Sequence, residues 1–259
     1  MFNWFINLNY VHQALIATLF TYLLTALGAS IVFFFKNISK NIMDAMLGFA
    51  AGVMTAASFF SLLSPAIEHC EELNLTAWLV ISIGFFSGGM LLFISDKIFN
   101  KLLSKKNKRI LMLVSSITIH NIPEGLAVGI AFGSVYYSLT GATTLSALML
   151  AIGIGLQNFP EGSAVSIPLR RDGMSRSKAF FYGQLSAIVE PIFGVLGAIL
   201  VLKVRTLLPF FLSFAAGAMI YVVVSELIPE SQSNKKKEIM AIFTIIGFSI
   251  MMILDVALG

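Results

Sequence analysis

The chain has 259 residues, of which 58% are hydrophobic and only 12% are charged, and its formal net charge is +4. Soluble domains carry about 25% charged residues, so this composition excludes a soluble globular domain and a disordered chain. The single cysteine, Cys70, cannot form an intrachain bridge, so a secreted disulfide scaffold is also excluded. The apolar, charge-poor composition leads us to predict an integral membrane protein.

Eight apolar segments follow one another along the chain. A helix needs about 20 such residues to cross a hydrocarbon core about 30 Å thick. We predict membrane-spanning helices over approximately residues 11–35, 43–67, 76–99, 110–136, 142–168, 179–202, 206–229 and 238–258. These spans leave little room for a soluble domain, so we expect residues 1–259 to form one all-α transmembrane domain. The first ten residues contain no Lys or Arg, so the basic start of a secretory signal is missing and the first span should stay in the membrane.

The positions of the basic residues predict the topology. Cytoplasmic loops of membrane proteins carry an excess of Lys and Arg. Fifteen of the 17 Lys and Arg residues lie in the connections after the first, third, fifth and seventh spans. We therefore expect these connections in the cytoplasm and both termini on the extracellular or periplasmic side. The basic character of the chain then reflects topology, with membrane lipid rather than nucleic acid as the partner of the loops.

Four glutamates lie well inside the predicted spans. They are Glu124, Glu161, Glu190 and Glu226. A charged side chain at this depth costs at least about 2.5–3.5 kcal/mol, and no Lys or Arg accompanies the four, so protonation or a bound cation has to compensate. Other acidic residues lie near the ends of spans, where we expect solvated or snorkelling side chains. These are Asp44, Asp96, Glu230 and Asp255.

Two of the glutamates belong to a repeated hexapeptide. His-Asn-Ile-Pro-Glu-Gly occupies residues 120–125 in the fourth span, and Gln-Asn-Phe-Pro-Glu-Gly occupies residues 157–162 in the fifth. Residues four apart share a helix face, so each motif forms a polar stripe, of imidazole, amide and carboxylate groups in the first and of amide and carboxylate groups in the second. The polar members are His120, Asn121, Glu124, Gln157, Asn158 and Glu161. Mixed nitrogen and oxygen donors of this kind form a ligand set for divalent metals.

The prolines of the motifs add backbone ligands. Pro123 and Pro160 lack an N–H group, so we expect the carbonyls of Ile119 and Leu156 to lose their helical hydrogen bonds. A freed carbonyl inside a membrane needs a partner, which a cation or an ordered water supplies. The alternative is a pair of ordinary proline kinks, which leaves the glutamates unexplained.

Glu190 extends the predicted site to the sixth span, where it precedes Pro191. At about 1.5 Å of rise per residue, His120, Glu161 and Glu190 each lie about 14–18 Å from the basic end of their span. We therefore expect helices 4, 5 and 6 to converge on one metal site near the middle of the membrane. Three carboxylates there repel one another unless cations neutralise them, which favours two divalent ions, with a single ion as the alternative. Zn²⁺, Cd²⁺, Mn²⁺ and Fe²⁺ suit these donors better than Cu⁺ does.

The two motifs, the eight-span pattern and the basic third loop resemble the ZIP family of divalent metal transporters, and in particular its bacterial GufA-like branch. Residues 48–68 and 215–230 also resemble the second and seventh helices of that branch. The resemblance covers nearly the whole chain.

The resemblance implies two adjacent metal sites in which Glu124 and Glu161 bridge the ions. The first site takes His120, Glu124, Gln157 and Glu161, and the second takes Asn121, Glu124, Asn158, Glu161 and Glu190. The family often has an acidic residue where this chain has Asn158. Met54 matches a position on the entry pathway. Glu226 matches a position towards the cytoplasmic exit, where Ser225 replaces a frequent histidine.

The resemblance also implies the function. We expect a secondary transporter, not an enzyme, that moves divalent metal, with zinc favoured, from outside into the cytoplasm. The metal is then a bound substrate, and no catalytic cofactor is expected. The resemblance further implies a homodimer in the plasma membrane, the inner membrane of a bacterium, and an elevator-like movement of helices one, four, five and six against a dimeric scaffold.

Two other functions remain open on the residues alone. An intramembrane metal hydrolase needs a metal-activated water, but the chain has no His-Glu-x-x-His motif. A proton-coupled carrier of an organic solute would use the buried glutamates to relay protons.

A second group of cation ligands lies at the predicted outer face. It consists of His12, Glu68, His69, Glu71 and Glu72. We expect a solvated helix end there, with collection of cations as the alternative.

Overall fold

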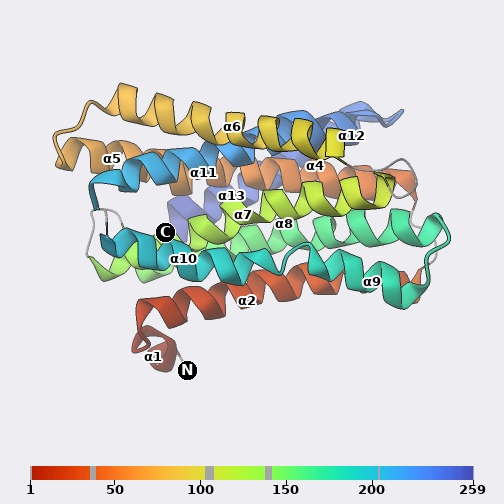
Figure 1. Ribbon diagram of the computed structural model, residues 1–259, viewed down its shortest axis with the longest axis horizontal. Coiled ribbons are helices and arrows are strands. Elements are labelled where there is room, and N and C mark those ends of the chain that lie inside the picture. Colours follow the sequence, from red (N-terminus) through yellow and green to blue (C-terminus); the bar gives the residue numbers. More distant parts are fainter. Residues whose placement is uncertain (1, 36–38, 103–107, 138–141, 204, 259) are drawn as a thin grey trace.

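The computed structural model describes residues 2–35, 39–102, 108–137, 142–203 and 205–258, and these form helices joined by short turns (Figure 1). The elements are α1 (Phe2–Ile6), α2 (Tyr10–Ala29), α3 (Ile31–Phe34), α4 (Lys40–Ala57), η1 (Ser58–Leu63), α5 (Ser64–Glu72), α6 (Ala77–Leu102), α7 (Lys108–Tyr136), α8 (Thr144–Arg171), α9 (Arg176–Leu185), α10 (Val189–Lys203), η2 (Arg205–Leu207), α11 (Leu208–Val222), η3 (Val223–Leu227), α12 (Ile228–Gln232) and α13 (Lys237–Leu258). The prediction of an all-α fold is confirmed for these described residues.

Six candidate membrane spans are found in the described part of the chain. They are Tyr10–Phe34, Lys40–Glu72, Ala77–Ile98, Arg176–Val201, Leu208–Gln232 and Lys237–Ala257. The helices α7 and α8, of 29 and 28 residues, carry the two polar motifs and are not among the six. The eight-span count and the outward-facing termini therefore stay predictions. Both chain ends lie opposite the α8–α9 and α12–α13 connections in Figure 1, and much of the basic third loop lies outside the described residues.

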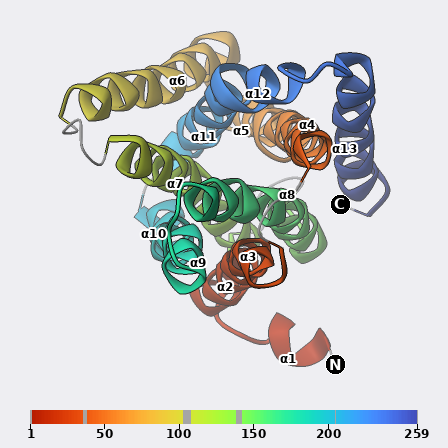
Figure 2. The ribbon, with the colours of Figure 1, turned by 90° about the vertical axis from the view of Figure 1, so that its right-hand side faces the viewer.

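The long helices form two bundles, which Figure 2 shows from one end. The first bundle consists of α2, α3, α7, α8, α9 and α10, with α2 packed on α8 and α7 packed on α10. The second consists of α4, α5, α6, α11, α12 and α13, with α4 packed on α13 and α6 packed on α11. The bundles meet chiefly where α4 packs on α8 and where α11 packs on α7.

Small apolar residues cover the second bundle's side of this interface. Buried alanines recur along α4 and α11, and Met54 and Met219 are fully buried among them. In the described part, side-chain hydrogen bonds between helices lie mainly inside one bundle, as between Tyr221 and Asp96. The contact of Ser163 Oγ with Met43 Sδ, at 4.0 Å, crosses the interface. On the α4 and α11 side, the interface therefore carries many small apolar residues, and few side-chain hydrogen bonds cross it in the described part.

Prolines interrupt helices at places that the hydropathy pattern did not predict. A π-helical turn, η1, precedes Pro65, and a second, η3, precedes Pro229. The predicted sixth span corresponds to the candidate span Arg176–Val201, within which residues 186–188 form a turn between α9 and α10 just before Pro191. A proline lacks the N–H that would continue the hydrogen-bond ladder and its ring clashes with the preceding turn, which favours such local changes.

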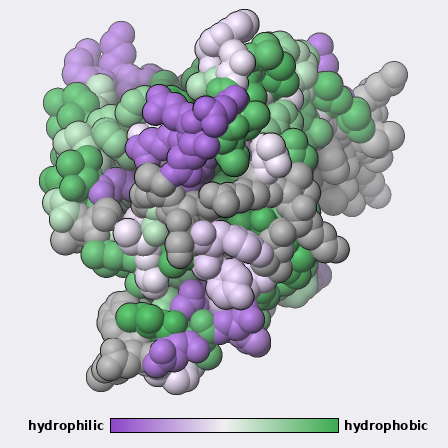
Figure 3. All heavy atoms as spheres, turned by 90° about the vertical axis from the view of Figure 1, so that its left-hand side faces the viewer, coloured by the Kyte–Doolittle hydropathy of each residue, from purple (hydrophilic) through white to green (hydrophobic). Residues whose placement is uncertain are grey.

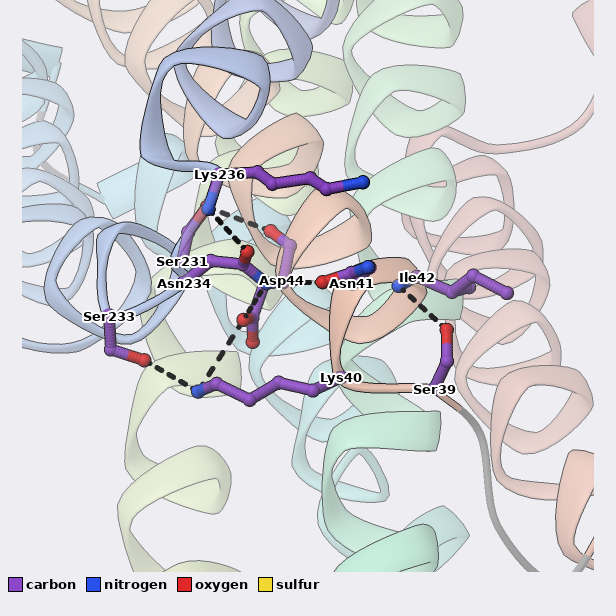
Figure 4. A network of polar contacts seen from close by, with 9 residues as sticks. All are labelled: Ser39, Lys40, Asn41, Ile42, Asp44, Ser231, Ser233, Asn234 and Lys236. Atoms are coloured by element: carbon purple, nitrogen blue, oxygen red, sulfur yellow. Dashed lines mark hydrogen bonds and ion pairs between the residues drawn. The ribbon is translucent and has the colours of Figure 1, made fainter.

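Asp44 lies in a polar network at the start of α4 (Figure 4). Its carboxylate accepts a hydrogen bond of 2.7 Å from Asn234 Nδ2 and lies 3.4 Å from Lys40 Nζ. Ser231 Oγ donates to the Asp44 carbonyl at 2.7 Å. Asp44 is only 1% exposed. The expectation of a solvated carboxylate is therefore wrong here, because the α12–α13 turn folds over the end of α4.

We expect Asp44→Ala to lower the free energy of unfolding by about 1–3 kcal/mol, because it removes the acceptor of a buried hydrogen bond. The readout is the melting temperature of the purified protein in detergent. Glu238→Ala is the matched control, because Glu238 is exposed at the start of α13 and the same charge is lost. Equal melting temperatures for the two variants would show that the network does not stabilise the fold.

Candidate metal centre

The predicted site residues that the structure describes are brought together in the first bundle. Asn121 and Glu124 come from α7, and Glu190 comes from the first turn of α10. Gln157, Asn158 and Glu161 come from α8. All six side chains are buried, with at most 5% exposure. The side chain of His120 lies outside the described residues, although its backbone belongs to α7.

Hydrogen bonds fix the two motif helices against each other. Gln157 Nε2 donates to Glu124 Oε1 at 2.8 Å, which ties α8 to α7. Electrostatic interactions also link Glu124 to Glu161 and Glu190, so the three carboxylates lie close enough to repel one another. No basic side chain is hydrogen-bonded or ion-paired to them among the described residues. The site is therefore a concentrated negative charge inside the bundle.

The centre also contains buried oxygen atoms that have no hydrogen-bond partner within the described residues. They are Asn121 Oδ1, Glu124 Oε2, Gln157 Oε1, Asn158 Oδ1 and Glu161 Oε1. Buried polar atoms are nearly always paired, because an unpaired one costs about 1–3 kcal/mol. All five atoms only accept, so a cation, or a water that donates, suits them.

Glu190 has a different environment from the other two carboxylates. Asn158 Nδ2 donates to both of its oxygens, at 2.9 and 3.0 Å, and Thr21 Oγ1 donates to Oε2. Nearby, Asn121 Nδ2 donates to the Ser186 carbonyl at 3.0 Å, in the turn between α9 and α10. These bonds tie α2, α7 and α8 to the start of α10.

Sequence reasoning missed Thr21. The one pattern that points to it is a row of buried threonines on α2, Thr18, Thr21 and Thr25, at spacings that place them on one face. A polar stripe on an apolar span indicates contact with another polar group, but it does not identify Glu190 as that group.

Gly125 brings α7 into direct contact with the backbone of Glu190. A Cβ atom at Gly125 would lie 2.5 Å from the Glu190 carbonyl oxygen and 2.8 Å from its Cα. Real Cβ atoms do not approach backbone so closely, so glycine is required for α7 and α10 to meet here. The motif glycine therefore sets the position of Glu190.

We expect Gly125→Ala to lower the free energy of unfolding by about 1–3 kcal/mol through overpacking. Gly89→Ala is the control, because a Cβ there would lie 3.4 Å from the Gly217 carbonyl oxygen, an ordinary contact. Alanine should be neutral at Gly89 or stabilise by up to about 1 kcal/mol, since it is the better helix former. Melting curves in detergent provide the comparison, and equal behaviour of the two variants would contradict the close packing.

The predicted pathway residues lie on the second bundle. Met54 is fully buried in α4, and Glu226 lies in the π-helical turn η3 within electrostatic range of Glu161. Ser225 precedes it, is exposed, and donates to the Tyr221 carbonyl at 2.7 Å. The structure thus brings Glu226 near the candidate metal centre, whereas the Ser225 hydroxyl is hydrogen-bonded to the backbone one turn earlier.

A cavity of about 200 Å³ lies at the end of the molecule that carries the chain termini, between the two bundles. Figure 3 views this end and shows hydrophilic side chains gathered on it. The residues that line the cavity include Glu68, His69 and Ser134. Ser61 and Asp255 also line it, and Ser61 Oγ donates to Asp255 at 2.7 Å. Burial of His69, at 2% exposure, shows that this part of the predicted outer cluster is not a solvated helix end. The rest is exposed, namely His12, Glu68, Glu71 and Glu72.

Carboxylates and histidines alone do not enclose a metal ion in the described part of the chain. No group of three His, Cys, Asp or Glu side chains there is placed to hold one. Any ion at this centre would therefore also need the amide oxygens of the motifs or residues whose side chains are not described.

Comparison with known proteins gives consistent matches. The model of the family described as ZIP Zinc transporter matches residues 102–255. The zinc transporter ZIP11 of Bos taurus is 39% identical over 335 aligned positions, covering 96% of this chain and 98% of the relative. The zinc transporter GufA of Myxococcus xanthus is 32% identical, and the alignment covers 95% of this chain and 98% of the relative. The zinc transporter ZIPB of Bordetella bronchiseptica is 33% identical, and the alignment covers 91% of this chain and 78% of the relative.

Proposed function

Because the chain belongs to the ZIP family of zinc transporters, we propose that it is a secondary transporter that carries divalent metal, with zinc favoured, from outside into the cytoplasm. It is a multi-pass membrane protein, and the family points to a transporter rather than an enzyme. Fe²⁺, Mn²⁺ and Cd²⁺ are further candidate substrates, because the donors are nitrogen and oxygen atoms without a thiolate.

The observation that carries this proposal is the cluster of unpaired acceptor oxygens between α7 and α8. Two of them, Glu124 Oε2 and Glu161 Oε1, belong to carboxylates in helices that cross the bundle. Two negative charges and several amide oxygens without a basic partner match the charge and the coordination of a divalent cation. We place the substrate ion between Glu124 and Glu161, with His120 as a further ligand.

The second ion implied by the resemblance would share Glu124 and Glu161 and would add Asn121, Asn158 and Glu190. This arrangement requires Glu190 to exchange its present hydrogen bonds for a metal ion. In that second part only Glu190 is already hydrogen-bonded through both oxygens, whereas Asn121 Oδ1 and Asn158 Oδ1 have no partner among the described residues.

For the transport step we propose that the first bundle moves as a body against the second, which forms a dimeric scaffold. Two features support a sliding movement. The polar contacts around the site lie inside the first bundle, and buried alanines with Met54 and Met219 recur on α4 and α11, where few side-chain hydrogen bonds cross to the first bundle among the described residues. An ion would enter through the outer cavity, pass Met54 and leave past Glu226.

Reconstituted vesicles provide the test of the function. Full-length protein in liposomes that contain a zinc-sensitive dye should show saturable Zn²⁺ entry down an imposed gradient, without ATP. Protein-free liposomes give the background rate. Entry no faster than this background would overturn the proposal.

The same preparation separates the two other functions. An intramembrane hydrolase would cleave a membrane substrate in a metal-dependent way and show no zinc flux. A carrier of organic solutes would show no binding of Zn²⁺ or Cd²⁺ by calorimetry at micromolar concentrations.

A further inference from the structure

We propose that the side chain of Met251 is a latch between the two bundles, a contact that has to break before the first bundle can slide along the second. Met251 belongs to α13 of the second bundle and is fully buried, and it contacts α8 of the first bundle at Gly153. The inference rests on the proposed function and names the residue that limits how readily the bundle moves.

The thioether of Met251 fills the space beside Gly153. A Cβ atom at Gly153 would overlap the Met251 sulfur and would lie 2.9 Å from its Cε and 3.7 Å from its Cγ. The methionine side chain therefore lies directly against the backbone of α8. A gap of about 0.5–1 Å already forfeits about a quarter to a half of the dispersion attraction between two atoms. The contact thus favours the relative position of the bundles that the structure shows.

Gly153 differs from the other glycines that the structure describes. Those with close neighbours face helices of their own bundle, most of them against backbone atoms, as Gly162 faces Thr25 of α2 and Gly52 faces Thr244 of α13. Gly153 faces the other bundle, and it faces a side chain. Backbone contacts yield only when a whole helix moves, whereas methionine is flexible about three side-chain bonds and can leave a space and refill it. The contact at Gly153 is therefore one that can be released.

The Met251 contact lies between the outer cavity and the candidate metal centre. Leu150 on α8 and Asp255 on α13 line the cavity. Gly153 follows Leu150 by three residues and precedes Gln157 of the centre by four, which is about 4.5 and 6 Å along the helix axis. Met251 precedes Asp255 by four residues, so each set of residues shares one helix face. The latch therefore engages where α8 has to move past α13 when the centre opens to the cavity.

Met251→Ala is expected to raise the rate of Zn²⁺ entry into proteoliposomes at least about threefold, because the bundle slides without first breaking this contact. Loss of a buried side chain through packing alone would not speed transport. Met240→Ala is the matched control, because it deletes a buried methionine of the same helix where α13 faces Gly48 of α4, and the rate should not rise. A rate at or below the wild-type value for folded Met251→Ala protein would overturn the inference.

The double variant Met251→Ala/Gly153→Ala decides the question if the single variant is poorly folded. The alanine methyl group at position 153 fills part of the space that the thioether leaves. We therefore expect the melting temperature to recover towards the wild-type value while Zn²⁺ entry stays faster than in the wild type. Recovery of the melting temperature together with the wild-type rate would show that Met251 only fills space, and would overturn the inference.

A cysteine reporter distinguishes a failure of this inference from a failure of the proposed function. Ile154, next to Gly153, is fully buried, so Ile154→Cys in a Cys70→Ala background should be labelled only when the bundles move apart. We expect a membrane-impermeant methanethiosulfonate reagent to label it at least about threefold faster once Met251→Ala is added. Equal labelling rates would overturn the latch. If only the proposed function is wrong, Zn²⁺ entry will match protein-free liposomes, but labelling will still be faster in the Met251→Ala protein.

Discussion

Glu124→Gln and Glu161→Gln are each expected to lower zinc uptake into proteoliposomes at least about 100-fold. Each change removes one negative charge from a buried site whose unpaired carboxylate oxygens are the proposed ligands of the transported cation. Removing one partner of a buried charge pair costs about 3–5 kcal/mol, and each 1.4 kcal/mol is a factor of ten in binding. Glutamine keeps the shape of the side chain, so the loss reports charge and coordination rather than packing.

Glu238→Gln is the matched control for this experiment. It makes the same chemical change at an exposed position outside the site, at the start of α13, and uptake should stay at the wild-type rate. Melting temperatures confirm that the site variants are folded. Full uptake by folded Glu124→Gln and Glu161→Gln proteins would show that the ion follows another path.

A cross-link between the two bundles is expected to lower uptake at least about tenfold. Met43 on α4 and Ser163 on α8 touch across the interface, with Sδ and Oγ 4.0 Å apart. Cysteines at both positions, in a Cys70→Ala background, can be joined by a short bifunctional methanethiosulfonate reagent, which forms a reducible disulfide with each cysteine. If transport needs the first bundle to slide along the second, the linked protein should hold its bound ion without releasing it.

Three comparisons separate restricted motion from simple blockage. A monofunctional reagent of similar size adds bulk to the same double variant without joining the bundles, and it should leave most of the uptake. Reduction of the cross-link should restore uptake. Uptake by the single-cysteine variants should not change when the bifunctional reagent is added. Unchanged uptake in fully cross-linked protein would indicate a fixed, channel-like path.

The sequence was sufficient to predict which helices bring the candidate site residues together. The repeated motif places Asn121 and Glu124 on one helix and Gln157 and Glu161 on the next, and helical periodicity alone puts them on shared faces. Burial of all four follows from their position in apolar spans, and the structure has them buried. Glu190 was found in the same way, as a carboxylate beside a proline in an apolar segment.

Hydrogen-bond orientation could not be predicted from the sequence. Asn158 offers both a donor and an acceptor, and only the position of Glu190 on a distant helix decides that its nitrogen faces the carboxylate. Thr21 acts through a contact with a residue 169 positions away. Burial of Asp44 depends on the path of the α12–α13 turn, because hydropathy near the end of a span does not report what folds over it.

Local helix geometry was the other part that the sequence did not predict. Prolines are visible in the sequence, but Pro123 lies within a continuous α7, whereas π-helical turns precede Pro65 and Pro229. Pro191 follows a turn at residues 186–188, inside the candidate span Arg176–Val201. Whether a proline leaves a helix continuous or causes a π-helical turn or a break depends on which groups of neighbouring helices bind the carbonyls that the proline frees. This is a property of tertiary packing.

The most direct test of the central claim is the location of a bound metal by anomalous scattering from crystals of the full-length protein grown with Cd²⁺ or Zn²⁺. The account predicts a peak within bonding distance of Glu124 Oε2 and Glu161 Oε1, between α7 and α8. Strong peaks elsewhere in the molecule, with none between these two carboxylates, would contradict it.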